Sequence, residues 1–436
     1  MPVTVARPRV LRGEIIAPGD KSVSHRAIML NALSHTGTAR ITNFSPGADC
    51  TSTVEIFRAL GVDIAREPGR DGMGDSLTVR GVGLNGLQEP ADVLDAGNSG
   101  TTTRLMSGIL AGRNIVTILT GDDSLKSRPM GRVVDPLRKM GAEITGRAGG
   151  TLAPLVFYGG SLKGTSYQMP VASAQLKSCL LLAGLRADGV TSITQPAESR
   201  DHTERMFSAM GVKLAKNGLE LTLEPSDLET VDIEIPGDIS SAAFWMIAGI
   251  CHPNAELLVR NVGINPTRAG IITLLQQMGA DLKLVDQREV AGEPVADVLV
   301  KSSQLKGVEL SGDIVPLLID EIPVIAVAAA LAEGTTTIRD AAELRVKESD
   351  RISASVSWMK GAGIDVTATD DGMVVIGGGS IRGGQFQSYD DHRLAMSLGI
   401  AGLVSDEPIT ILDPDVAGIS YPGFWKTVER FGGLVG

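Results

Sequence analysis

Residues Gly97–Gly112 read GNSGTTTRLMSGILAG. The stretch opens with glycines and small polar residues, continues as an apolar run, and ends at a glycine. Small residues let the backbone approach a ligand closely, and the first amides of a helix favour an anion. The stretch therefore predicts a buried helix that carries chemistry at its beginning.

The same plan recurs along the whole chain and predicts a repeated fold. Its copies begin at Gly19, Gly97, Val171, Gly237, Leu318 and Tyr389. A second signature, a helix end followed by a glycine and a strand, alternates with the first; its glycines are Gly61, Gly141, Gly211, Gly279, Gly363 and Gly432. The spacing of roughly seventy residues exceeds the ~20–50 residues typical of solenoid repeats. We predict six α/β units, each with two helices and several strands, grouped as three plus three.

Composition limits the class of protein. With 436 residues, of which 43% are hydrophobic, the chain can bury large cores, and its length favours two or three domains. Its net charge is -11. Nucleic acids and anionic membranes need a basic face, so we predict neither as a partner, and any basic site must be local.

Several features indicate a reducing, aqueous compartment. Residues 1–19 lack the apolar region of a signal peptide, and the apolar run Ile322–Ala332 is too short to span a bilayer. The cysteines are Cys50, Cys179 and Cys251, without CxxC spacing. We predict a cytoplasmic protein with unreactive thiols and no metal site.

Two charged segments are candidates for anion binding. Lys21, Ser22 and Arg26 lie in the first turns of the helix that follows Gly19-Asp20. There the helix dipole and two cations would favour a phosphate or carboxylate, although Asp20 could simply cap the helix. Later, Lys347 and Arg351 stand four residues apart, a repulsive arrangement unless an anion or a carboxylate lies between them.

Other polar features have simpler interpretations. The loop Gly97–Thr103 lacks the lysine of a P-loop, so nucleotide binding is not supported. His202 and His392 stand in polar clusters without metal-ligand spacing. We interpret both as structural histidines with satisfied hydrogen bonds.

Seven ordered motifs carry a resemblance to a known family. They read GDKSVSHR, GNSGTTTRL, SRPMGRVVDPL, SAQLKS, ESRDHTERM, LRVKESDRI and DDHRLAMS. Over essentially its whole length the chain resembles the 5-enolpyruvylshikimate-3-phosphate synthases. The motifs GDKS, SAQLK, RDHTE and NPTR are more similar to the second bacterial class of that family than to the first.

The resemblance implies an architecture. It is an α/β fold of two similar domains, each with three βαβαββ units arranged as an inside-out α/β barrel (the enolpyruvyl transferase fold). The chain would cross twice between domains, so that residues 1–20 join 239–436 in one domain and 21–238 form the other. The active site is expected in the cleft between them.

The resemblance also implies a reaction and its residues. The enolpyruvyl group of phosphoenolpyruvate would pass to the 5-hydroxyl of shikimate 3-phosphate by addition and elimination, without metal or cofactor. Asp320 matches the hydroxyl base and Glu348 the group that moves protons at the methylene, assisted by Lys21. The residues implied around shikimate 3-phosphate are Lys21, Ser22, Arg26, Ser173, Ala174, Gln175, Arg200, Asp320 and Lys347. Those implied around phosphoenolpyruvate are Lys21, Asn98, Gly100, Thr101, Arg128, Gln175, Arg351 and Arg393.

Two positions depart from the family pattern. Some members carry a late lysine that contacts phosphoenolpyruvate, whereas this chain reads Ala417-Gly-Ile-Ser-Tyr421-Pro422. Glu343 stands where other members have asparagine. The resemblance therefore leaves open what replaces the lysine and what Glu343 does.

Alternatives and an inhibitor complete the expectations. The related transferase that acts on UDP-N-acetylglucosamine typically uses a loop cysteine, and residues Gly121–Gly131 contain none. A catalytically silent anion-binding protein of the same fold is the other alternative. We expect a monomer. Glyphosate competes with phosphoenolpyruvate in this family. The second-class motifs favour tolerance of glyphosate, whereas Gly100 favours sensitivity, because an alanine at this position would intrude on the inhibitor. We predict sensitivity.

Overall fold

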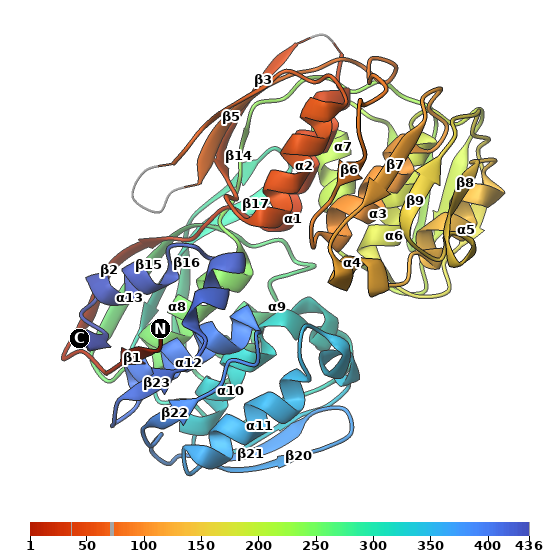
Figure 1. Ribbon diagram of the computed structural model, residues 1–436. Helices are drawn as coiled ribbons and strands as arrows, with labels where there is room; N and C mark the ends of the chain where they lie inside the picture. The colour runs from red at the N-terminus through yellow and green to blue at the C-terminus, as the bar shows by residue number, and fades with distance from the viewer. Residues whose placement is uncertain (36, 70–73, 436) are drawn as a thin grey trace. The chain divides into compact units, whose positions relative to one another are not determined.

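A computed structural model describes residues 1–35, 37–69 and 74–435 (Figure 1). The chain divides into two compact units, which we call the N unit and the C unit. The N unit comprises Gly19–Ile235 and Glu289–Glu293, and the C unit comprises Met1–Pro18, Pro236–Arg288 and Pro294–Gly436.

The short segment Glu289–Glu293 corrects the expected assignment of all of 239–436 to one domain. It packs with the N unit because its groups satisfy buried partners there. The Glu293 carboxylate lies 2.8 Å from His202 Nδ1, and Arg205 Nη1 donates to Gly292 O at 3.1 Å. A buried carboxylate needs such partners, and sequence spacing does not reveal them.

Among the described residues, each unit contains three four-stranded sheets of one design, in which the first two strands are parallel and the other neighbouring pairs whose register is resolved are antiparallel. The N-unit sheets are β14 (Ile233–Glu234), β3 (Thr38–Phe44), β5 (Asp75–Arg80), β4 (Ile64–Glu67); β6 (Leu94–Asp95), β7 (Thr117–Thr120), β9 (Leu152–Phe157), β8 (Ile144–Arg147); and β10 (Ser166–Gln168), β11 (Thr191–Thr194), β13 (Glu220–Leu223), β12 (Leu214–Asn217).

The C-unit sheets follow the same order of strands. They are β2 (Leu11–Ile16), β15 (Ala255–Gly263), β17 (Glu293–Lys301), β16 (Asp281–Val290); β18 (Glu309–Leu310), β19 (Gly334–Ile338), β21 (Met373–Gly377), β20 (Asp365–Ala368); and β22 (Gly384–Phe386), β23 (Ile409–Ile411), β1 (Val3–Val5), β24 (Leu434–Val435).

Three of the six repeats borrow a strand from a distant part of the chain. β14 completes the sheet of the first repeat, β2 that of the fourth, and β1 that of the last. β2 and β14 flank points where the chain passes between units, whereas β1 lies near the N-terminus. Helix and glycine patterns cannot identify them, since strand partners depend on tertiary contacts.

Within the described residues, each repeat supplies one buried and one partly buried helix, and the second repeat adds the short helix α4 (Asp123–Ser127). The buried helices are α1 (Lys21–Leu33), α3 (Gly100–Leu110), α6 (Ala174–Gly184), α8 (Ile239–Cys251), α10 (Ile322–Leu331) and α12 (His392–Val404). The partly buried ones are α2 (Ala48–Ala59), α5 (Gly131–Lys139), α7 (His202–Ala209), α9 (Gly270–Gln277), α11 (Arg351–Gly361) and α13 (Phe424–Arg430). The buried helices are rich in small and apolar residues, as expected for helices that other helices and strands surround on all sides. A Cβ on Gly108 of α3 would lie 2.1 Å from the Cys179 backbone oxygen of α6, so this glycine allows the two helices to pack closely.

The six repeat glycines confirm the second sequence signature. Each directly follows the C-cap residue of a partly buried helix and has a positive φ, between 75° and 101°. This left-handed conformation ends the helix and turns the chain into the next strand, and glycine adopts it without steric cost. The predicted two-helix repeat is therefore present in all six copies.

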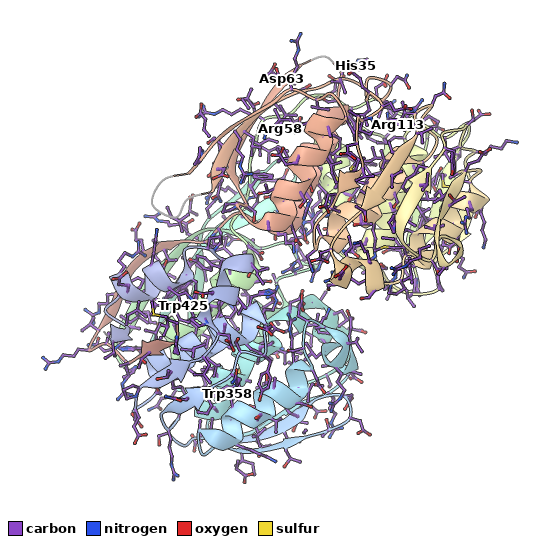
Figure 2. The ribbon with its side chains drawn as sticks, in the orientation of Figure 1. His35, Arg58, Asp63, Arg113, Trp358 and Trp425 are labelled. Carbon is purple, nitrogen blue, oxygen red and sulfur yellow. The ribbon has the colours of Figure 1, made fainter. Side chains whose placement is uncertain are left out.

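The core is clearest in the C unit, which holds all three tryptophans (Trp358 and Trp425 are labelled in Figure 2). Trp245 is fully buried, and its ring centroid lies 5.6 Å from that of Phe424. Within the described residues, no helix is long and apolar enough to cross a membrane.

Candidate active site

Several candidate residues lie at the beginnings of the buried helices. Side chains at the N-caps accept backbone N–H groups there: Asp20 Oδ1 from Val23 at 2.9 Å, Ser99 Oγ from Thr102 at 3.1 Å, and Ser173 Oγ from Leu176 at 3.4 Å. Such caps fix the first turn, whose free amides and dipole favour anions. Asp20 therefore does cap its helix, and Lys21 is the first helical residue.

Lys21 is held by a carboxylate that the sequence analysis missed. Its Nζ forms an ion pair with Asp49 in the first turn of α2. Burial would raise the pKa of Asp49, but Lys21, His25 and Arg128 hold it below its usual value. Asp49 thus orients an ammonium group that remains 43% exposed and available to an incoming anion. Only its first-turn position in α2 could have marked it.

Arg26 is placed differently from the expectation. The side chain is 4% exposed; its Nε donates to Thr203 Oγ1 at 2.7 Å and its Nη2 to Ser178 Oγ at 2.8 Å. Burial lowers its pKa to about 10. The structure thus gives Arg26 an interior role that joins α1 to α6 and α7, whereas the sequence analysis assigned it to shikimate 3-phosphate directly.

The loop before α3 is braced by two side-chain pairs. Arg128 Nη2 donates to Asn98 Oδ1 at 2.6 Å, and Gln175 Nε2 donates to Thr101 Oγ1 at 3.1 Å. These contacts bring four of the residues assigned to phosphoenolpyruvate to one place beside Gly100.

Arg104 adds a cation that the sequence analysis did not assign. Its Nη1 donates to Gln175 Oε1 at 2.8 Å. Burial and the nearby Arg132 and Arg128 lower its pKa to about 10. A charged residue inside an otherwise apolar helix was the available signal, because such a residue is rarely buried without a partner.

Ser173, Ala174 and Arg200 lie around a buried ion pair. Lys177 is fully buried; its Nζ lies 2.5 Å from Glu204 Oε1 and donates to Ser199 O at 3.1 Å. These contacts tie the beginning of α6, which Ser173 caps, to the segment that carries Arg200. Lys177 therefore holds together, from the protein interior, the two segments that carry the predicted binding residues.

In the C unit, Asp320 lies between two cations. Its Oδ1 is 3.8 Å from Lys347 Nζ and 3.6 Å from Arg351 Nη1. This confirms that a carboxylate lies between the two cations. The cations do not, however, lie on one face of a single helix, as the spacing of four residues suggested. Lys347 has an extended backbone and directly follows a 3₁₀ turn (Ala342–Val346), whereas Arg351 is the first residue of α11.

Arg351 is surrounded by further carboxylates. Its Nε donates to Asp391 Oδ2 at 2.7 Å and its Nη2 to Glu348 Oε2 at 2.7 Å, with 1% of the side chain exposed. Burial would raise the pKa of Glu348, but the Arg351 charge holds it below its usual value. Nε and Nη2 of Arg351 are thus committed to protein carboxylates, whereas Nη1 lies 3.6 Å from Asp320 Oδ1 and is the nitrogen best placed to meet a ligand.

Glu343 and Arg393 complete this cluster. Lys347 Nζ donates to Glu343 Oε1 at 2.7 Å, which gives the departure at Glu343 a role in holding the lysine. Arg393 Nη1 donates to Asp320 O at 3.1 Å. The structure therefore brings together Asp320, Lys347, Glu348, Arg351 and Arg393.

The two histidines only partly fit their interpretation as satisfied structural residues. His202 Nδ1 pairs with Glu293, but its Nε2 is buried with no partner among the described residues. His392 Nδ1 is likewise buried without a partner. Burial, followed by the charge of Arg393, lowers the pKa of His392 to about 4, so this ring is neutral near pH 7.

Cysteine and metal chemistry receive no structural support in the described part of the chain. Burial raises the pKa of Cys179, and it raises the pKa of Cys50 and of Cys251 to about 12, which agrees with the unreactive thiols expected at Cys179 and Cys251. No group of three or more His, Cys, Asp or Glu side chains there could hold a metal ion.

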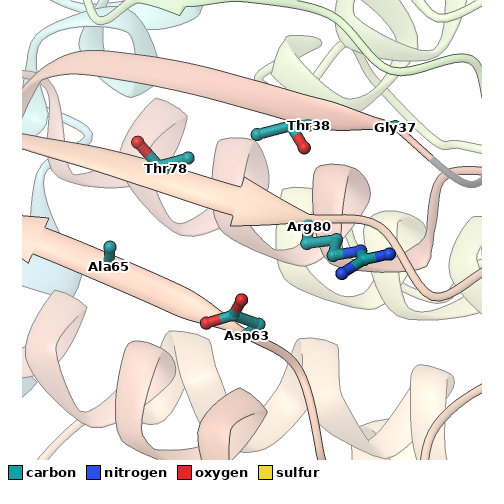
Figure 3. A pocket seen from close by; sticks show the side chains of 6 residues that line it. All are labelled: Gly37, Thr38, Asp63, Ala65, Thr78 and Arg80. Atoms are coloured by element: carbon teal, nitrogen blue, oxygen red, sulfur yellow. The ribbon is translucent and has the colours of Figure 1, made fainter.

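A cavity of about 440 Å³ lies elsewhere in the N unit (Figure 3). Its lining residues come mainly from β3, β4 and β5 and are Gly37, Thr38, Asp63, Ala65, Thr78 and Arg80. None of these is a candidate site residue. The chemistry is therefore better located by the charged helix beginnings than by the size of this hollow.

His25 gives a testable pH dependence of stability. The ring is fully buried, with Nδ1 2.7 Å from Thr53 Oγ1, and burial together with Lys21 lowers its pKa from 6.5 to about 3. Between these values the unfolded chain binds a proton that the folded chain excludes, so stability falls as pH falls. We expect the pH-dependent loss between about pH 6.5 and 4.5 to be roughly 2–3 kcal/mol smaller in His25→Gln.

Urea titrations at both pH values measure this difference by circular dichroism. The exposed His35→Gln is the matched control. Tryptophan fluorescence, whose three tryptophans all lie in the C unit, shows in the same titrations whether that unit unfolds at the same urea concentration. Equal pH sensitivity of wild type and His25→Gln would contradict the assignment.

Comparisons with known proteins match nearly the whole chain and all indicate the same family. The model of the family EPSP synthase (3-phosphoshikimate 1-carboxyvinyltransferase) matches residues 5–428. The 3-phosphoshikimate 1-carboxyvinyltransferase of Pelobacter propionicus is 52% identical over 422 residues, which are 97% of this chain and 96% of that protein. A solved EPSP synthase from Acinetobacter baumannii matches with a TM-score of 0.92 and 44% identity, covering 100% of this chain and 99% of that chain. The enolpyruvyl transferase NikO from Streptomyces tendae, with 18% identity, a TM-score of 0.78 and coverage of 99% and 97%, shares the fold. The chain therefore belongs to the EPSP synthase family.

Proposed function

We propose that the chain transfers the enolpyruvyl group of phosphoenolpyruvate to the 5-hydroxyl of shikimate 3-phosphate and releases phosphate. The observation that carries the proposal is the position of Asp320, a carboxylate between Lys347 and Arg351, in a chain of this family. Both substrates are strongly anionic, which suits the cations at the helix beginnings in a chain of net charge -11.

The chemistry needs three proton transfers, two in the addition and one in the elimination. As the hydroxyl oxygen bonds to C2 of phosphoenolpyruvate, Asp320 takes the hydroxyl proton and the methylene carbon gains a proton. In the elimination, the new methyl group loses a proton while the C2–phosphate oxygen bond breaks. Glu348 handles the proton at this carbon, with Lys21 assisting, and the cations stabilise the charge that develops on phosphate.

The contact between Glu348 and Arg351 suggests how Glu348 could carry a proton. In the free protein the Arg351 charge lowers the pKa of Glu348, so the carboxylate is ionised. An anionic ligand that pairs with Arg351 would compensate its positive charge and so raise the pKa of Glu348 again. Binding of phosphoenolpyruvate would thereby prepare Glu348 to accept and return a proton.

The proposal assigns the two substrates to residues of both units. Lys21, Ser22, Ser173, Ala174, Gln175, Arg200, Asp320 and Lys347 would bind shikimate 3-phosphate. Lys21, Asn98, Gly100, Thr101, Arg128, Gln175 and Arg393 would bind phosphoenolpyruvate. Arg26 would act from the interior, and Arg351 through Nη1, which lies 3.6 Å from Asp320 Oδ1. We also propose that the reaction needs no metal or cofactor, since ammonium and guanidinium groups supply the positive charge. We propose in addition that the protein is a cytoplasmic monomer.

An acceptor assay tests the function. Phosphate release from phosphoenolpyruvate is measured with shikimate 3-phosphate, with UDP-N-acetylglucosamine and without acceptor. We expect release only with shikimate 3-phosphate. Release with the nucleotide sugar would indicate the related transferase, and no release with either acceptor would indicate a silent binding protein.

Substitution of three arginines tests the assignment of the ligands. Arg128→Ala and Arg393→Ala should weaken phosphoenolpyruvate by about tenfold or more, since each removes a charge-assisted contact, while Arg200→Ala should chiefly weaken shikimate 3-phosphate. Separate titrations of each ligand measure the effects, with the exposed Arg339→Ala as control. A uniform loss for both ligands in all three variants would refute the assignment.

A further inference from the structure

Glu321 is a buried carboxylate to which neither the motifs nor the mechanism assigns a role. It directly follows Asp320, ends a 3₁₀ turn (Ile319–Glu321) before α10, and is 2% exposed. Its Oε1 accepts a hydrogen bond from Ser240 Oγ. The same oxygen lies 3.6 Å from Arg268 Nη2 and 3.8 Å from Arg393 Nη1.

The two arginines come from different elements and meet at this oxygen. Arg268 precedes α9 and is 4% exposed; its Nη2 donates to Ser240 Oγ at 2.7 Å and lies 3.8 Å from Asp238 Oδ1. Arg393 lies in the first turn of α12. Ser240 is in the first turn of α8, whose N-cap is Asp238. The beginnings of α8, α10 and α12 are therefore joined through Glu321.

Charge explains why a carboxylate is needed at this point. Two guanidinium groups with little exposure repel each other, and the positive ends of three helix dipoles add to the same sign. Buried charges are tolerated only when they are paired and hydrogen-bonded. Glu321 supplies a negative charge between the arginines, and Arg393 is the one whose Nη1 also donates to the backbone oxygen of Asp320.

We propose that Glu321 is a positioning residue that holds the Arg393 guanidinium in place for phosphoenolpyruvate and fixes it relative to Asp320. This inference rests on the proposed function, in which Arg393 contacts phosphoenolpyruvate. Glu321 itself does not touch the substrate. Its effect is on where the Arg393 charge stands and on how much repulsion from Arg268 it experiences.

Glu321→Gln keeps the shape of the side chain and removes its charge. The expected result is a KM for phosphoenolpyruvate raised by about tenfold, with kcat and the affinity for shikimate 3-phosphate within about threefold of wild type. Glu309→Gln, in an exposed part of the C unit, is the matched control and should leave both constants unchanged.

A second substitution separates positioning from mere structural support. If repulsion by Arg268 displaces Arg393, then Glu321→Gln combined with Arg268→Met should bring the KM back to within about threefold of wild type. Loss of a purely structural hydrogen bond would instead be aggravated by removing Arg268. Glu321→Asp keeps the charge and should retain more phosphoenolpyruvate affinity than Glu321→Gln, while tryptophan fluorescence reports whether the C unit is folded.

The outcomes distinguish this inference from the proposed function. A wild-type protein that releases no phosphate from phosphoenolpyruvate and shikimate 3-phosphate would refute the function. An active wild type whose KM for phosphoenolpyruvate is unchanged in Glu321→Gln would refute the positioning role alone. A double variant with a higher KM than the single variant would also overturn it.

Discussion

Asp320→Asn is expected to fold and bind both substrates but to lose about a hundredfold or more in kcat. The amide has nearly the same shape as the carboxylate, whereas it cannot accept the hydroxyl proton. The substitution also removes the negative charge that lies 3.8 Å from Lys347 Nζ and 3.6 Å from Arg351 Nη1. Steady-state phosphate release measures kcat, and equilibrium titration measures the binding of each ligand.

The matched control is Asp313→Asn, in an exposed position of the 3₁₀ turn Gly312–Leu317. It should leave kcat unchanged. If Asp320→Asn kept kcat within about threefold of wild type, Asp320 would not be the base. A large loss of both binding and stability would indicate instead that the carboxylate mainly balances the two cations.

Gly100→Ala is expected to relieve inhibition by glyphosate, with a smaller cost for phosphoenolpyruvate. A Cβ at Gly100 would lie 2.8 Å from Arg104 Nη1 and 3.5 Å from Arg128 Nη1. The methyl group would therefore displace the ends of two cationic side chains and occupy space beside them. Glyphosate is the longer molecule, so it should lose more from this intrusion than the substrate does.

The measurement compares the glyphosate inhibition constant with the KM for phosphoenolpyruvate. We expect competitive inhibition of the wild type and, in Gly100→Ala, an inhibition constant that rises about tenfold more than the KM. Gly131→Ala is the control, since a Cβ there meets nothing closer than 3.6 Å. Equal changes in both constants, or a wild type that glyphosate does not inhibit, would refute the prediction.

The repeat and its helices could be predicted from sequence because their causes are local. Apolar runs, polar caps and a glycine after each helix are short-range requirements, and all six repeat glycines have the positive φ that the pattern implies. Strand partners are not local. β1 pairs with strands more than 400 residues away, and Glu289–Glu293 belongs to the N unit because of the buried His202.

The candidate site shows the same division. Charge alone predicted that an anion or a carboxylate lies between Lys347 and Arg351, but it did not identify Asp320 as that carboxylate. Asp49 and Glu321 act through side chains distant in sequence, so no motif marks them. Arg26 and Arg351 are assigned to ligands by the resemblance, yet both are buried among protein partners.

The central claim is that the reaction proceeds by addition and elimination, with a proton gained and then lost at the methylene carbon. Incorporation of solvent deuterium tests this claim most directly. The reaction is run in deuterium oxide with phosphoenolpyruvate and shikimate 3-phosphate, and the product is examined by proton NMR. The account predicts phosphate released in step with product and deuterium in its vinyl methylene group, because that carbon gains a solvent proton and then loses one. Turnover that leaves the methylene free of deuterium, or no turnover with shikimate 3-phosphate, would contradict it.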